Sequence, residues 1–253
     1  MQLLGINIYK KTPKAVRKVL VPDWYPFGDY KRPGKGRPVR IKQNWKETAA
    51  FKVYQREGLP EITVNCIVGM NGAGKSTLLD LLYMSINNMA VRLLGKKAKL
   101  QSGRSLSYAR GLYADFFFLC EENQYRISCR DIQTKLYILN EETKSFRILS
   151  IRNNDDAKSI LSKLFYTIST NYSLYAFNQS EYVAEEDEPA DPEEAFVVGI
   201  DGEWLSGLFH KNDGYFTPIV ITPYRETGNI SVQKENRLAS QRIMALALLQ
   251  KAQ

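Results

Sequence analysis

The chain has 253 residues with 44% hydrophobic side chains, enough for one large domain with a buried core, and it carries a formal net charge of +8. No apolar run is long enough for a transmembrane helix, and residues 1–10 become polar too quickly for a signal peptide. Three cysteines (Cys66, Cys120 and Cys129) have no metal-ligand spacing, which favours buried thiols in a reducing, cytoplasmic compartment.

A first strand is predicted over residues 3–9, followed by a basic insertion over residues 11–47. Up to Leu59 the chain has fourteen basic and four acidic residues, a net charge of +10, with aromatic residues between them. Basic side chains neutralise phosphates and aromatic rings stack on bases, so the segment 10–56 is a candidate nucleic-acid surface. The alternative is a solvated insertion that its aromatic residues hold against the domain.

A second strand at 50–54, a buried strand at 61–68 and a helix from about residue 75 to residue 94 follow. The nine residues 69–77, Gly-Met-Asn-Gly-Ala-Gly-Lys-Ser-Thr, match a complete phosphate-loop motif between that strand and that helix. The predicted binding residues are Gly69, Asn71, Gly72, Ala73, Gly74, Lys75, Ser76 and Thr77.

Each residue type in this loop has a chemical role. The three glycines allow positive φ and a close approach of the backbone to phosphate, and the helix N-terminus directs N–H groups at the anion. Lys75 would reach the β- and γ-phosphates, and the Ser76 hydroxyl would ligate Mg²⁺. We therefore expect a nucleoside triphosphate site, with Lys75 as a catalytic residue. The alternative is a glycine turn with no ligand.

After the helix the pattern changes to strands over residues 112–149, with runs at 114–120, 125–129 and 136–139. Polar connectors of hairpin length are predicted at 121–124 and 140–143. A helix at 155–165, a strand at 166–177, a helical piece at 199–209 and a terminal helix at 234–250 complete the prediction. The acidic stretch 181–194 contains two prolines and is interpreted as a solvated loop. The predicted fold class is α/β with an antiparallel β-subdomain and a C-terminal helix.

The loop pattern G-x-N-G-x-G-K-S-T resembles that of the ABC ATPases, and within them the SMC, RecF and OLD-nuclease group, which includes bacterial AAA-family ATPases often found in anti-phage defence. The resemblance implies a P-loop NTPase head with ATP and Mg²⁺ as cofactors. It implies one domain over residues 1–253, expected to be the N-terminal portion of such a head. It also implies a homodimer that closes around nucleotide and drives a nucleic-acid-handling or defence complex, with an effector protein as a possible partner.

Other motifs of that group are incomplete in this sequence. Residues 205–208 only partly match its signature, and His210, the only histidine, comes before the place where its switch histidine would fall. Residues 116–122 resemble its Walker B strand, with Glu122 as the candidate base, but they follow the loop too soon, and an edge hairpin with a polar turn is the alternative. Gln179 is the candidate for the glutamine that contacts Mg²⁺ and the attacking water. We therefore expect the isolated chain to bind ATP and to hydrolyse it poorly. A stand-alone P-loop kinase and an ATP-regulated nucleic-acid-binding module are the alternatives.

Overall fold

The structure is a computed structural model, and it describes residues 2–40, 66–94, 106–120, 123–151, 156, 159–160, 164, 167–170, 177–182, 202–209, 219–222 and 231–251. Several sequence predictions lie outside these residues. They are the strand at 50–54, Glu122, the acidic loop beyond residue 182, and the basic segment beyond residue 40. The described residues form a mixed α/β fold, as the sequence predicted.

A six-stranded antiparallel sheet forms one layer, with the strand order β2-β1-β3-β4-β5-β6. Its strands are β1 (Gln2–Ile8), β2 (Trp24–Pro26), β3 (Tyr113–Cys120), β4 (Asn123–Arg130), β5 (Gln133–Asn140) and β6 (Ser145–Ile148). The predicted antiparallel strands are therefore confirmed. The prediction of a polar connector at 121–124 was wrong in part, because Asn123 and Gln124 pair with β3 as the first residues of β4.

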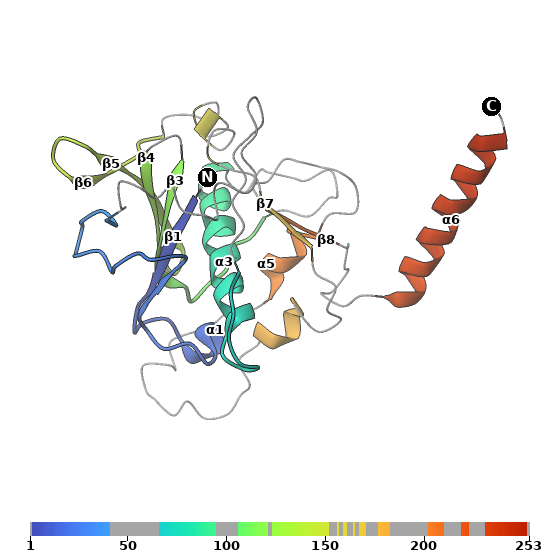
Figure 1. Cartoon of the computed structure of the whole chain (residues 1–253), viewed down its shortest axis with the longest axis horizontal. Helices are drawn as coiled ribbons and strands as arrows, with labels where there is room; N and C mark the ends of the chain where they lie inside the picture. The colour runs from blue at the N-terminus through green and yellow to red at the C-terminus, as the bar shows by residue number, and fades with distance from the viewer. Residues whose placement is uncertain are drawn as a thin grey trace.

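Helix α3 (Lys75–Leu94) packs against the inner face of this sheet (Figure 1). Successive strand residues alternate between faces, so Phe116, Ile127 and Leu136 all point inward and are almost fully buried against the helix. A short parallel pair, β7 (Thr167–Thr170) and β8 (Ile219–Thr222), lies on the other side of α3. Because layers cover the helix on two sides, most of its residues are buried, including polar ones.

One of these buried polar residues fixes the chain that enters β3. The side-chain amide of Asn88 donates to the carbonyl oxygen of Ala109 at 2.8 Å, and its oxygen accepts from the Ala109 N–H at 2.7 Å. A buried amide that lacked such partners would destabilise the fold. The two hydrogen bonds therefore fix the position of Ala109 against α3.

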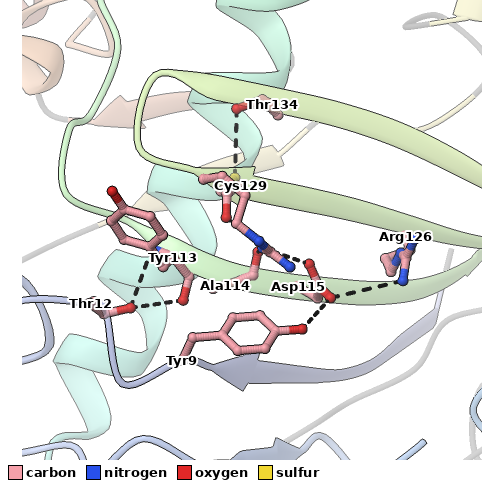
Figure 2. A network of polar contacts seen from close by, with 9 residues as sticks. Tyr9, Thr12, Tyr113, Ala114, Asp115, Arg126, Cys129 and Thr134 are labelled. Carbon is pink, nitrogen blue, oxygen red and sulfur yellow. Dashed lines mark hydrogen bonds and ion pairs between the residues drawn. The ribbon is translucent and has the colours of Figure 1, made fainter. Parts of the chain in front are cut away.

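The outer face of the sheet holds a network of polar contacts around Asp115 on β3 (Figure 2). The Asp115 side chain is only 5% exposed. Tyr9 donates a hydrogen bond of 2.6 Å to Oδ2, and Arg130 lies 2.9 Å from Oδ1 as an ion pair. Arg126 lies 3.9 Å from Oδ2, with its guanidinium 4.1 Å from the centroid of the Tyr137 ring. The network therefore joins the residue after β1 to β3 and β4, with two arginine side chains beside one buried carboxylate.

The basic segment begins on two short elements that were not predicted from the sequence, helix α1 (Lys14–Arg17) and strand β2. The segment then crosses the outer face of the sheet. There Val39 and Phe117 are buried in a small apolar cluster with Leu4, which Trp24 and Tyr30 flank. The aromatic residues do hold this part of the segment against the domain. Its basic side chains Lys31, Arg32, Lys35, Arg37 and Arg40 are exposed.

Helix α6 (Val232–Lys251) projects away from the rest of the molecule (Figure 1). Those of its side chains that the structure describes are exposed, including Leu238, Ile243, Met244 and Leu248. Within the described part of the chain, neither α6 nor any other helix combines the length and the apolar character required to cross a membrane.

Candidate phosphate-binding site

The phosphate-loop residues lead directly into the N-terminus of α3. Gly72 and Gly74 have φ values of +81° and +86°, in the left-handed region that glycine adopts without strain. The N–H of Leu78 donates to the Gly74 carbonyl oxygen at 2.9 Å, so the first hydrogen bond of the helix starts at this glycine. Helix geometry leaves the N–H groups of the first turn without intrahelical partners, and these groups suit an anion.

Lys75 is the first residue of the helix, and its side chain folds back over the loop. Its Nζ donates hydrogen bonds to the carbonyl oxygens of Gly69 at 2.7 Å and Met70 at 2.8 Å. A side chain at position 69 would enter ordinary contact with Lys75, since a Cβ atom there would lie 3.8 Å from Cγ and Cδ of the lysine. Gly69 does not share the positive φ of Gly72 and Gly74, so the expectation of positive φ was wrong for this glycine.

The other loop residues differ in exposure, and the exposed ones are open to a ligand, whereas the buried ones pack within the protein. Asn71, Gly72, Ala73 and Ser76 are exposed, and Gly74 and Lys75 are half-buried. Thr77 is 5% exposed and belongs to the packed side of the helix. The hydroxyl available to a metal ion is therefore that of Ser76, and Thr77 lies among the packed residues of the first helical turn.

The segment after α1 packs against the loop. A Cβ atom at Gly74 would lie 2.6 Å from Cδ2 of Leu20 and 3.1 Å from Cγ2 of Val19. A Cβ atom at that distance would force the Leu20 side chain to move, so packing as well as φ favours glycine at position 74. This contact was not predicted from the sequence, because residues 19–20 and residue 74 are far apart in the chain.

The strand predicted before the loop is not present in its described part. Cys66, Ile67 and Val68 have no regular secondary structure and are exposed, with Val68 86% accessible. An apolar run becomes a strand only when neighbouring strands take up its backbone groups, and no described strand pairs with residues 66–68. The expectation that all three thiols are buried was also wrong for Cys66, whereas Cys120 and Cys129 are buried.

Gln179, the candidate that contacts the attacking water, begins the 3-10 helix η2 (Gln179–Tyr182) and is half-buried. The buried phenol of Tyr182, in the same turn, donates a hydrogen bond to the carboxylate of Asp80 on α3. Asp80 follows Lys75 by five residues, about 7 Å along a helix axis. The structure therefore brings the turn of Gln179 to the helix that begins at the phosphate loop.

Asp80 is 7% exposed, and its burial raises its pKa to about 6. The Lys18 charge and the Tyr182 hydrogen bond oppose this shift, and Glu181 adds to it. Burial and the Asp80 carboxylate both raise the pKa of Tyr182, so the phenol keeps its proton and remains the donor. Sequence reasoning missed this pair, because a single Asp in a helical run and a distant Tyr give no shared pattern.

The two partial motif matches lie in packed structure. The signature-like residues 205–208 cover the end of α5 (Glu203–Ser206) and the two residues after it, and Leu205 and Leu208 are fully buried. Residues 116–120 of the Walker B-like run lie on β3, between β1 and β4 in the antiparallel sheet. This run was predicted to lie in an edge hairpin, but β3 is an interior strand. Its candidate base Glu122 and the histidine at 210 lie outside the described residues.

The described side chains include no group of three or more His, Cys, Asp and Glu residues that could hold a metal ion. A Mg²⁺ ion at Ser76 would instead take its other ligands from phosphate oxygens and water, the ligands Mg²⁺ usually has beside nucleotides. A scan against protein-family models and searches of curated proteins and solved structures found no match to this chain. The resemblance of the loop to that of ABC-type ATPases therefore depends on the sequence of residues 69–77.

Proposed function

We propose that this chain binds Mg·ATP at residues 69–77 and acts as an ATPase module of the ABC and SMC type. The observation that carries the proposal is the position of Lys75. Its ammonium group is bound to two carbonyl oxygens of the same loop, beside two glycines with positive φ. A lysine beside a glycine loop at a helix N-terminus brings together a cation and backbone N–H groups, and polyphosphate binding uses both.

Each residue of the loop would have its own role in binding. Lys75 would leave the carbonyl oxygens of Gly69 and Met70 and neutralise the β- and γ-phosphates, and the exposed Ser76 hydroxyl would hold the metal ion. Bound Mg²⁺ supplies charge neutralisation at the phosphates. Catalysis of phosphoryl transfer depends mainly on such positioning and charge, so the loop supplies binding and part of the catalysis. Gln179 would orient the water.

The proposal is tested by titrating the chain with a fluorescent ATP analogue in the presence of Mg²⁺. Lys75→Ala should abolish measurable binding, because it removes the cation without altering the helix. Lys135→Ala is the matched control, since Lys135 is an exposed lysine on β5 with the same charge. Equal affinity of the Lys75→Ala variant and the wild type would refute the proposal. Efficient phosphate transfer to a small acceptor by the isolated chain would favour the kinase alternative.

We further propose that nucleotide-dependent dimerisation serves a nucleic-acid-handling or defence complex. What supports nucleic acid as a partner is the segment 31–40, whose exposed basic side chains are carried on a backbone anchored to the sheet. A fixed backbone lowers the entropic cost of presenting several cations to one phosphate chain.

A further inference from the structure

The segment 177–182 is held at both ends by one face of α3. At its start the ring of Phe177 packs on the ring of Tyr83, with centroids 5.7 Å apart. At its end the phenol of Tyr182 bonds to Asp80. Residues 80 and 83 are three positions apart and so share a helix face. Gln179 therefore lies between two anchors on the first turns after the phosphate loop.

Residues in and just before α5 also pack against this turn. A Cβ atom at Gly202, which precedes α5, would lie 2.4 Å from Cα of Gln179, so the backbones are in direct contact there. Trp204 packs edge-on against Tyr182, with ring centroids 5.7 Å apart, and both side chains are almost fully buried. The turn of Gln179 is thus packed from α5 as well as from α3.

Lys18 connects this turn to the other side of the phosphate loop. Its ammonium group lies 2.8 Å from Oε2 of Glu181 and 5.1 Å from the centroid of the Tyr182 ring. Lys18 ends α1 with φ of +49°, a conformation that is costly for a residue with a side chain. The next residues, Val19 and Leu20, are those that contact Gly74. A continuous set of contacts therefore runs from Gly74 through Lys18 to the turn.

We propose that Asp80, Tyr182 and Lys18 are positioning residues that couple the state of the phosphate loop to the position of the Gln179 turn. The inference depends on the proposed function, since it names a regulation of the same site. Filling the loop with phosphate draws Lys75 away from Gly69 and Met70 and changes the loop where it contacts Leu20. The change reaches the turn of Gln179 through Lys18, while Asp80 on the packed helix holds the other end of the turn in place. Coupling of this kind is reciprocal in free energy.

Hydrogen exchange measured by mass spectrometry on the full chain tests the coupling. The probe is Mg²⁺ with a non-hydrolysable ATP analogue, and the two readouts are the peptides that cover residues 69–77 and 177–182. In the wild type, nucleotide should slow exchange in both. In Tyr182→Phe, protection of 69–77 should persist while that of 177–182 falls by roughly fivefold or more, the lower end of typical coupling.

Tyr83→Phe is the matched control. It removes another buried phenol hydroxyl from the same surface, one that hydrogen-bonds to Ser169, and keeps the ring against Phe177. This variant should retain protection of both peptides. Equal loss in Tyr182→Phe and Tyr83→Phe would show a general loosening of α3 and would overturn the inference.

A second route avoids the buried positions and remains informative should Tyr182→Phe fail to fold. Lys18→Gln breaks the partly exposed ion pair with Glu181 and should also reduce protection of 177–182, whereas Lys18→Arg, which keeps the charge, should restore it. Protection of 69–77 without protection of 177–182 in the wild type overturns the coupling and leaves the proposed function intact. Absence of protection at 69–77 overturns both.

Discussion

Gln124 on β4 pairs with the backbone of Val39 as a neighbouring strand would. Its Oε1 accepts a hydrogen bond of 2.7 Å from the Val39 N–H, and its Nε2 donates one of 3.0 Å to the Val39 carbonyl oxygen. Both residues are buried, with exposed fractions of 3% and 2%. The pair anchors the basic segment over the outer face of the sheet and fixes where its cations lie.

Nucleic-acid binding by this segment should depend on salt. For the double variant Lys35→Ala/Arg37→Ala, we expect weaker binding of single-stranded DNA and a salt slope lower by about 1.4, near 0.7 for each phosphate that is no longer neutralised. Lys234→Ala/Arg237→Ala on α6 removes the same charge elsewhere and should leave the slope unchanged. Fluorescence anisotropy over a series of salt concentrations measures both, and equal slopes in the two variants would exclude this surface.

The two left-handed glycines of the phosphate loop should differ in their tolerance of alanine. Gly72→Ala meets no atom within 4 Å and should cost about 1 kcal/mol of stability, from its φ of +81° alone. Gly74→Ala should cost at least about 2 kcal/mol, since its Cβ also meets Leu20. Urea unfolding compares the two variants. A Gly74→Ala variant as stable as Gly72→Ala would contradict the packing of Leu20 on the loop.

Asp80 should make stability depend on pH. Because its pKa rises on folding, from 3.8 to about 6, the folded state holds the proton more tightly. The free energy of unfolding should therefore fall as pH rises from about 4 to about 6, by up to about 3 kcal/mol. Lys18, Glu181 and Tyr182 are the other charged or titratable groups near Asp80, and Tyr182 stays protonated because burial and the Asp80 carboxylate raise its pKa.

Asp80→Asn is the variant that isolates this effect. It keeps an acceptor for Tyr182 and removes the titration, so it should be more stable than the wild type at neutral pH and lack this fall. Urea unfolding of both proteins at several pH values measures the difference. Parallel curves for the two proteins would show that Asp80 does not cause the pH dependence.

Loss of the Asp115 network should strongly lower the free energy of unfolding. Asp115→Ala leaves Arg126 and Arg130 without their carboxylate and should reduce stability by about 3 kcal/mol. Asp23→Ala removes an acid from an ion pair with Arg32 in which both side chains are 58% exposed, and it should cost less than about 1 kcal/mol. Thermal and chemical unfolding decide between these expectations, and similar losses in both variants would contradict the burial of the network.

The thiols should react at different rates. Cys66 is exposed three residues before the phosphate loop, whereas Cys120 and Cys129 are buried and burial raises the pKa of Cys129 to about 12. A thiol reagent should therefore label one cysteine quickly in the native protein and all three after unfolding. Fast labelling of Cys129 would contradict the packing of β4 on α3. Bound Mg·ATP should slow labelling of Cys66.

The elements predicted correctly are those whose pattern is set by one local rule. The run 114–120 is a strand whose side chains alternate between the two faces of the sheet, and α3 is a long apolar helix after a glycine loop. The pattern of its own residues is therefore enough to predict each element. The run 66–68 has the composition of a strand, but pairing decides strand formation, and pairing is not a local property. The same holds for Asp80 and Tyr182, 102 positions apart, whose contact depends on how α3 and η2 are packed together.

Helix α3 is enclosed by the antiparallel sheet on one side and contacts β8 on the other. Rotation or sliding of its first turn would open two packed interfaces at once, and close-packed interiors resist such displacement. Any adjustment to an incoming anion must therefore occur in the short stretches that flank the helix start, residues 69–74 and residues 18–20. The helix itself stays in place, and the residues that contact the anion adjust their positions beside it.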